Sequence, residues 1–106
     1  MEFIETPTFT KWLKSNVSDD EYREFQTELA INPSKGDMIK GTGGFRKARI
    51  AYGDHGKRGG GRVIYYWLDD DDQIYLVIGY SKGEKSDLSE REKHVLKGLV
   101  SQLKGD

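Results

Sequence analysis

Apolar side chains recur at helical spacing in three segments of the chain. The first, "TPTFTKWLKSN", has Thr6 as a candidate N-cap and Pro7 at the first helical position. The other two, "SDDEYREFQTELAINP" and "SEREKHVLKGLVSQLKG", each open with the S-x-x-E capping-box pattern, and Pro33 closes the earlier one. The apolar faces consist of Phe9, Trp12 and Leu13; of Tyr22, Phe25 and Leu29; and of Val95, Leu96, Leu99, Val100 and Leu103. These faces predict two N-terminal helices and one C-terminal helix.

Between the second and third helices the pattern changes to short β-branched and aromatic runs, separated by glycine-rich or acidic turns. The strand-like runs are "DMI", "FRKARIAY", "RVIYYWL" and "IYLVIGY", and residues 2–4, "EFI", could form a first strand. In the second run Ala48, Ile50 and Tyr52 alternate with Lys47, Arg49 and Ala51, which predicts one buried face and one largely basic face.

The order of these elements, β-α-α-β-β-β-α, predicts the fold class. We expect one α+β domain over residues 1–106, with a small antiparallel sheet of about four strands, two N-terminal helices and one C-terminal helix.

Composition narrows the possible functions. The chain has 106 residues and no cysteine, which excludes a disulfide framework, a thiolate nucleophile and the usual cysteine-based zinc site. The N-terminus has no basic and apolar leader pattern, and no stretch approaches the roughly 20 apolar residues of a membrane-spanning helix. We therefore expect a cytoplasmic protein without membrane contact.

The formal net charge of −1 hides an uneven distribution. Residues 40–66 hold an excess of six positive charges, so the remainder is strongly acidic. The charged residues of this window are Lys40, Arg46, Lys47, Arg49, Lys57, Arg58 and Arg62, with Asp54 as its acid. This polarity predicts a basic surface suited to an anionic partner.

Three familiar site types do not fit the chain. The glycine-rich segment around Lys57 lacks the G-x-x-x-x-G-K-[ST] pattern of a phosphate-binding P-loop. The acidic run Asp69–Asp72 lacks the ligand spacing of a calcium loop and is better explained as a hairpin turn. His55 and His94 fall on different elements, so we expect no metal and no cofactor.

Two neighbouring segments carry the candidate chemistry. In the loop Gly53–Gly61, glycines allow close approach to a ligand, and His55, Lys57 and Arg58 supply donors for phosphate oxygens. Arg62 begins a strand that looks central, so its guanidinium should be held rigidly. In an antiparallel hairpin the segment "GYSKGEK", with Tyr80, Lys82, Glu84 and Lys85, returns beside the start of that strand.

Each feature also has a purely structural explanation. A glycine-rich loop is usually a mobile turn, and surface lysines such as Lys82 and Lys85 usually serve solubility. The basic residues Arg46, Lys47 and Arg49 could be only an exposed strand face. The aromatic residues Tyr65, Tyr66, Trp67 and Tyr75 are better explained as sheet core than as stacking platforms for bases.

Three motifs in fixed order carry a family resemblance: "GTGGFRK", then "GKRGGGRVIYY", then "YSKGEKSDL". Together with "SDDEYREFQTELAINPSKGDMIK" upstream, they cover nearly the whole chain, which resembles the RelE/ParE superfamily of bacterial toxins, closest to its HigB2-like branch. The resemblance implies a ribosome-dependent mRNA endonuclease that cleaves translated mRNA in the ribosomal A site. It also implies inhibition by a cognate HigA-like helix-turn-helix antitoxin.

The resemblance also implies site residues. Metal-independent cleavage through 2′-hydroxyl attack needs a base, cations for the pentacoordinate phosphorane and an acid for the leaving 5′-oxygen. Arg62 matches the strand arginine of the family, and Tyr80 and Lys82 match its residues at the end of the last strand. The general base stays open among Lys57, Lys82 and Lys85. Catalytic roles are thus expected for Arg62, Lys57, Tyr80 and Lys82, and RNA or phosphate contacts for Arg58, His55, Lys47, Arg49 and Lys85.

The chain also departs from the family pattern. Several members carry a C-terminal tyrosine or histidine that stacks on an mRNA base, whereas the segment after Tyr80 has no aromatic residue before His94, within the predicted helix. Some relatives in the superfamily act on gyrase and cleave no RNA. Two alternatives therefore remain at this stage: a non-catalytic nucleic-acid-binding module and a ParE-like gyrase-directed toxin.

Overall fold

A computed structural model describes residues 1–53, 60–85 and 87–105 of the chain. Its elements follow the predicted order; the "DMI" run forms a short strand of its own, which makes five strands instead of about four, and a 3-10 turn, η1, lies in the β4–β5 hairpin. They are β1 (Glu2–Glu5), α1 (Pro7–Asn16), α2 (Asp19–Ile31), β2 (Asp37–Met38), β3 (Arg46–Ile50), β4 (Gly61–Leu68), η1 (Asp69–Asp71), β5 (Gln73–Ser81) and α3 (Glu90–Lys104).

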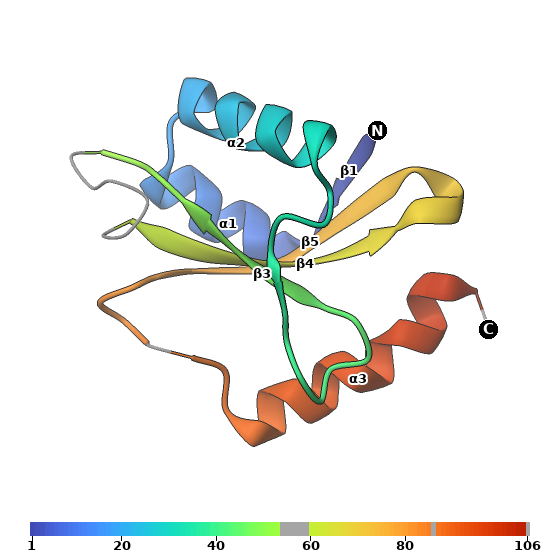
Figure 1. Ribbon diagram of the computed structural model, residues 1–106. Coiled ribbons are helices and arrows are strands. Elements are labelled where there is room, and N and C mark those ends of the chain that lie inside the picture. Colours follow the sequence, from blue (N-terminus) through green and yellow to red (C-terminus); the bar gives the residue numbers. More distant parts are fainter. Residues whose placement is uncertain (54–59, 86, 106) are drawn as a thin grey trace.

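The strands form one sheet in the order β1-β5-β4-β3-β2. Figure 1 shows α1 and α2 on one face of this sheet and α3 on the other. Neighbours from β2 to β5 pair antiparallel, as predicted, whereas β1 pairs parallel with β5. The sheet is therefore mixed and has five strands, because β1 leads into a helix and is not constrained by a hairpin to run antiparallel.

Each face of the sheet has its own hydrophobic core. Under α1 and α2, Phe9, Leu13, Phe25 and Leu29 pack on strand residues such as Tyr65. Under α3 the second core joins the helix to the opposite face of the same strands. Its buried residues are Ile39, Phe45, Ile64, Tyr66, Val77, Tyr80, Leu88 and Leu96. The central strands β4 and β5 are thus covered on both sides, which limits the movement of the backbone that carries the side chains at their ends.

The predicted caps are present at all three helices. Thr6 accepts a hydrogen bond from the Phe9 amide, and complete capping boxes start α2 and α3. The apolar stripe of α3 is narrower than predicted, because Val95 keeps 57 % of its surface exposed while Leu96 is buried. His94 lies within α3, as predicted, and is exposed. These caps define where each helix starts relative to the sheet.

Helix α1 lies close to the sheet because two glycines leave room for the indole of Trp12. A Cβ atom at Gly79 would lie 2.2 Å from Trp12 Cε3, and one at Gly61 would lie 3.2 Å from Trp12 Cζ2. The indole also meets the Tyr52 ring edge-on at 5.7 Å. The first core therefore extends to the end of the sheet where β4 begins.

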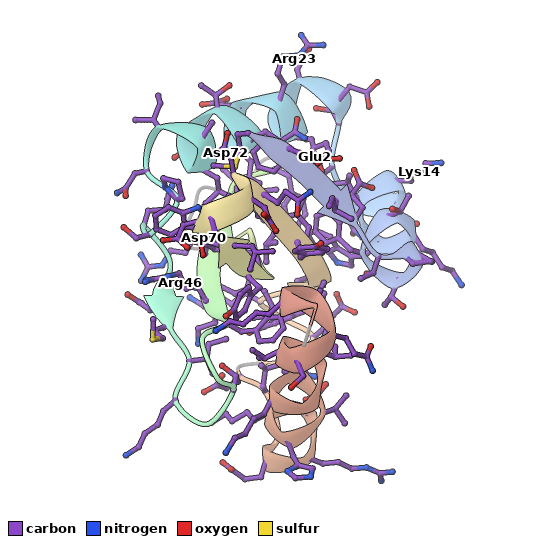
Figure 2. All side chains as sticks on the ribbon, turned by 90° about the vertical axis from the view of Figure 1, so that its right-hand side faces the viewer. Glu2, Lys14, Arg23, Arg46, Asp70 and Asp72 are labelled. Atoms are coloured by element: carbon purple, nitrogen blue, oxygen red, sulfur yellow. The ribbon has the colours of Figure 1, made fainter. Side chains whose placement is uncertain are left out.

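The acidic run after β4 forms the predicted hairpin end. Residues Asp69–Asp71 make a 3-10 turn, and Asp72 follows in the left-handed conformation, with φ at 53°. Aspartate tolerates this conformation better than most residues. Figure 2, which views this end of the molecule, shows Asp70 and Asp72 on the turn. The acidic residues thus lie at the opposite end of β4 from Arg62.

Within the described parts of the chain, no helix is long and apolar enough to cross a membrane.

Candidate functional site

Three polar side chains form one row across the sheet. Arg49 of β3 is the register partner of Arg62 in β4, and Arg62 is the register partner of Tyr80 in β5. Directly opposed residues in antiparallel strands project from the same face, with Cα atoms about 4.5–5.5 Å apart. We call Arg49, Arg62 and Tyr80 the cross-strand row; it lies on the face that α3 partly covers.

The two arginines of the row differ in how firmly they are held. Arg62 is half-buried, and its Nη1 donates a hydrogen bond of 3.0 Å to the Gly61 carbonyl. Arg49, on β3, is exposed. Like charges directly opposite each other destabilise a sheet, and a bound anion between them would remove that repulsion. The row therefore presents a pair of guanidinium groups suited to a phosphate.

Tyr80 completes the row with a buried hydroxyl. The residue is only 5 % exposed, and its Oη has no hydrogen-bond partner among the residues that the structure describes. Burial raises the pKa of Tyr80, the charge of Asp87 raises it further, and the charge of Arg62 opposes both. The hydroxyl therefore keeps its proton at neutral pH and can serve as a hydrogen donor but not as a base.

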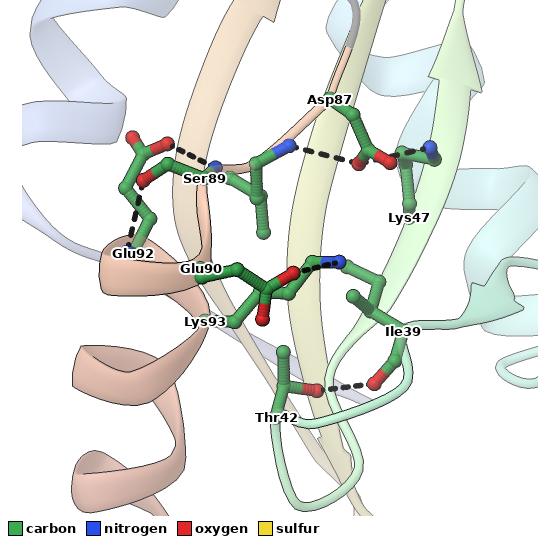
Figure 3. Close-up of polar contacts among 9 residues, drawn as sticks. Ile39, Thr42, Lys47, Asp87, Ser89, Glu90, Glu92 and Lys93 are labelled. Carbon is green, nitrogen blue, oxygen red and sulfur yellow. Dashed lines mark hydrogen bonds and ion pairs between the residues drawn. The ribbon is translucent and has the colours of Figure 1, made fainter.

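Lys47 lies two residues before Arg49 and shares its face of β3. Its ammonium pairs with the Asp87 carboxylate at 3.5 Å, a contact that Figure 3 shows across the gap between β3 and the segment before α3. The Leu88 amide, which is the main cause, and the charge of Lys47 lower the pKa of Asp87. Asp87 is therefore ionised, and in the absence of another anion its carboxylate is the ion-pair partner of Lys47.

Lys85 approaches the row from the same connecting segment. Its Nζ lies 5.7 Å from the centre of the Tyr80 ring and donates a hydrogen bond of 2.6 Å to the Glu92 carboxylate. Lys85 and the Ser89 backbone amide together lower the pKa of Glu92. Glu92 thus caps α3 and holds the ammonium of Lys85 over Tyr80 at the same time.

The remaining predicted residues divide into two groups. Lys82 is exposed just after β5, and its backbone amide donates to the Gly60 carbonyl at 3.1 Å. His55, Lys57 and Arg58 lie outside the described residues. The structure therefore brings Arg49, Arg62, Tyr80, Lys47 and Lys85 to one face, and Lys82 follows just after the end of β5.

Sequence reasoning missed Asp87 and treated Glu92 only as a helix cap. Both acids contribute to the raised pKa of Tyr80, and each pairs with one of the predicted lysines. The segment "SDLSE" carried the only signal, an extra acid just before the capping box. Its position opposite Lys47 depends on how α3 folds back over the sheet.

No cluster of three or more metal-ligating side chains occurs among the residues that the structure describes. What the face offers instead is positive charge from arginine and lysine, together with one retained hydroxyl proton. Such groups can bind a phosphate, stabilise negative charge that develops on it and donate a proton to a leaving oxygen.

Comparison with known proteins finds one matching family model and two solved structures of similar fold. The family model of the RelE toxin of the RelE/RelB toxin–antitoxin system matches residues 1–105. The isolated E. coli RelE toxin has a similar fold, with a TM-score of 0.59 at 13 % identity, covering 93 % of this chain and 98 % of that one. The archaeal RelE–RelB complex from Pyrococcus horikoshii matches with a TM-score of 0.51 at 26 % identity, covering 79 % of this chain and 97 % of that one.

Proposed function

The chain belongs to the RelE toxin family of toxin–antitoxin systems, and from this premise we propose that it is a ribosome-dependent mRNA endonuclease. Its substrate is translated mRNA in the ribosomal A site, and cleavage inhibits translation. The observation that carries the proposal is the cross-strand row, in which two arginines and a tyrosine with a buried hydroxyl are successive register partners on one face of the sheet. Such a combination suits phosphoryl transfer without a metal.

In the proposed reaction the 2′-oxygen of one nucleotide attacks the adjacent phosphorus while its proton passes to a base. The bond to the 5′-oxygen breaks, leaving a 2′,3′-cyclic phosphate on one fragment and a 5′-hydroxyl on the other. Arg62 stabilises the charge of the pentacoordinate phosphorane, since its half-buried position on a central strand limits its movement. Arg49, its register partner, adds a second positive charge to the same phosphate.

Tyr80 is the best candidate for the proton donor to the 5′-oxygen. Its raised pKa keeps the proton on the hydroxyl, and Oη lacks a competing partner within the described structure. Access to this hydroxyl requires the substrate to displace part of the cover over Tyr80. The general base remains one of Lys57, Lys82 and Lys85; the Nζ atom of Lys85 lies 5.7 Å from the centre of the Tyr80 ring.

The flanking cations position the RNA. Lys47 and Lys85 contact phosphates beside the row, and His55 and Arg58, in the segment that precedes β4 in the sequence, supply further contacts. Lys57 belongs to the same segment and is also a candidate for catalysis. Because these contacts are mainly electrostatic, we expect RNA affinity to fall steeply with salt concentration.

The partner that we propose is a small antitoxin encoded beside the toxin gene. The archaeal relative was solved as a RelE–RelB complex, which supports an antitoxin of some kind for this chain. We further propose that the chain belongs to the HigB2-like branch and that its antitoxin is a HigA-like helix-turn-helix protein. An acidic segment of this partner would be steered to the basic face. A target on translating ribosomes also implies a cytoplasmic location.

The test combines purified protein, ribosomes and a short message, with cleavage mapped by primer extension. We expect cuts within codons that occupy the A site, and none when ribosomes are omitted. Intact message at stoichiometric protein would overturn the proposal. Intact message together with DNA damage in cells would instead indicate a gyrase-directed toxin, and tight RNA binding without cuts would indicate a binding module.

A further inference from the structure

A hydroxyl bridge joins the two outer strands of the cross-strand row on the opposite face of the sheet. Tyr52 Oη lies 2.6 Å from Ser81 Oγ, although the two residues are 29 positions apart in the chain. Tyr52 lies just beyond the end of β3, and Ser81 is the last residue of β5. The Tyr52 side chain therefore spans β4, which separates these two strands in the sheet.

The bridge passes over Gly61, the first residue of β4. A Cβ atom at Gly61 would lie 3.0 Å from Tyr52 Cε1 and 2.8 Å from the Tyr80 carbonyl oxygen. Trp12 of α1 closes the other side of the Tyr52 ring, edge-on at 5.7 Å and 89°. With only 7 % of its surface exposed, Tyr52 is held between the helix and the strand.

The bridge has a second acceptor in reach. Tyr52 Oη lies 3.5 Å from the Gly60 carbonyl oxygen, at the outer limit of a hydrogen bond. Ser81 can then donate to Tyr52 while Tyr52 donates toward Gly60. The same Gly60 carbonyl accepts a hydrogen bond of 3.1 Å from the Lys82 amide. The end of β5 is therefore linked to Gly60 directly through Lys82 and indirectly through Ser81 and Tyr52.

The position of the bridge relative to the row gives it a functional meaning. Ile50, Gly61 and Ser81 are register partners of one another through β4, immediately next to Arg49, Arg62 and Tyr80. In the described strands, these three residues are the last ones paired at this end of β3, β4 and β5. Strand ends fray unless side chains hold them, and the Tyr52–Ser81 bond holds this end across all three strands.

We propose that Tyr52 and Ser81 are positioning residues that fix the spacing of Arg49, Arg62 and Tyr80 for RNA cleavage. The inference rests on the proposed nuclease function. Neither hydroxyl belongs to the row, since both lie on the opposite face of the sheet. Their loss should let the strand ends move apart, and displacements of about 1 Å at reacting groups can reduce rates by about a hundredfold.

The experiment compares Tyr52→Phe and Ser81→Ala with a matched control, Tyr22→Phe. Tyr22 also donates a hydroxyl hydrogen bond, 2.8 Å to Glu5, but on the N-terminal side of the molecule. Single-turnover cleavage on ribosomes gives the rate, and titration with RNA gives the affinity. We expect the rate to fall about tenfold or more in both bridge variants while affinity changes less than about twofold.

Two further variants separate positioning from general damage. The double variant Tyr52→Phe/Ser81→Ala should be no slower than Tyr52→Phe alone, since that single variant already removes the hydroxyl that bonds to Ser81. Ser81→Thr, which keeps the hydroxyl, should restore most of the rate. The proposal is overturned if the bridge variants cleave as fast as Tyr22→Phe, or if their rates fall only in proportion to the fraction of unfolded protein.

A readout without RNA distinguishes failure of this inference from failure of the proposed function. If the wild-type protein leaves messages intact, the nuclease proposal fails, yet the bridge can still be examined by NMR. Tyr52→Phe should increase the mobility of the Arg62 Nε–H group and the Tyr80 amide, whereas Tyr22→Phe should leave both unchanged. Equal relaxation in all three proteins would refute the positioning role.

Discussion

Arg62 and Tyr80 are direct register partners on β4 and β5, and both project from the sheet face that α3 partly covers. The arginine is a permanent cation, and the tyrosine is a buried hydroxyl whose pKa is raised despite that cation. Burial is the dominant cause, with Asp87 adding to it. The pair therefore combines a group that stabilises negative charge with a group that retains a transferable proton.

Replacing Arg62 tests its role in the transition state. Arg62→Ala should lower the ribosome-dependent cleavage rate by about 10²–10³, the usual cost of removing one preorganised donor. RNA affinity should weaken only modestly, because Arg49 and Lys47 remain on the same face. Arg62→Lys should recover part of the rate by restoring charge without the planar fork. Parallel losses of rate and affinity would instead point to a binding role.

Tyr80→Phe should separate stability from activity. The hydroxyl is buried without a partner in the described structure, so its removal relieves a desolvation cost of about 1–3 kcal/mol. We expect urea denaturation to show a variant at least as stable as the wild type. Cleavage should nevertheless fall at least tenfold if the hydroxyl protonates the leaving oxygen. A variant with unchanged activity would remove Tyr80 from the mechanism.

Asp87→Asn should strengthen RNA binding, because the carboxylate competes with phosphate for Lys47. Asparagine keeps an oxygen that can accept from the Leu88 amide, so the turn before α3 is preserved. We expect affinity to rise severalfold at low salt, with the gain shrinking as salt screens the charges. Asp70→Asn makes the same charge change on the distant hairpin and serves as the control. Equal effects of the two changes would rule out local competition at Lys47.

Glu92→Gln should alter the acid stability of α3. The pKa of Glu92 is lowered in the folded state, so its ionised form contributes stability above its ordinary value of 4.5. That contribution disappears as the pH falls through the lowered pKa. The variant should be less stable than the wild type at pH 7, and the two should converge in acid, as measured by urea denaturation.

The control for this acid effect is Glu24→Gln on the exposed side of α2, where the carboxylate makes no ion pair with the described residues. At pH 7 its denaturation midpoint should lie closer to that of the wild type than the midpoint of Glu92→Gln does. A gap between Glu92→Gln and the wild type that stays constant down to pH 3 would contradict the assignment to Glu92 ionisation.

Two glycine replacements should change stability in opposite directions. Gly79→Ala places a Cβ atom 2.2 Å from Trp12, which should cost about 1–3 kcal/mol by overpacking α1 against β5. Gly98 lies in α3, and a Cβ atom there would meet no other atom within 4 Å. Gly98→Ala should therefore raise the free energy of unfolding by about 0.5–1 kcal/mol through helix propensity. Thermal denaturation of both variants measures the difference. A harmless Gly79→Ala would contradict the close packing of Trp12.

Local patterns predicted most of the fold. The capping boxes at Ser18 and Ser89 mark the starts of α2 and α3, because the bonds that cap a helix involve residues only three positions apart. The hairpin at Asp69–Asp72 and the alternation in β3 are equally local. The parallel pairing of β1 with β5 was not predictable in this way, since the partners are about 70 residues apart.

The candidate site was predictable where it follows from one hairpin. The antiparallel connection of β4 to β5 brings Tyr80 back to Arg62, as the sequence patterns indicated. Asp87 escaped notice because its contact with Lys47 spans 40 residues and depends on where the segment before α3 crosses the sheet. The Tyr52–Ser81 bridge depends on three strands at once, and no spacing along the chain indicates it.

The helices, the strands, the turns and the concentration of positive charge in residues 40–66 follow from local sequence, because each arises from neighbours along the chain. Which of those charges share a face, which hydroxyls are buried and which acids oppose the lysines became apparent only in the folded molecule. Register and helix packing set these relationships, and they depend on the burial of both hydrophobic cores at once.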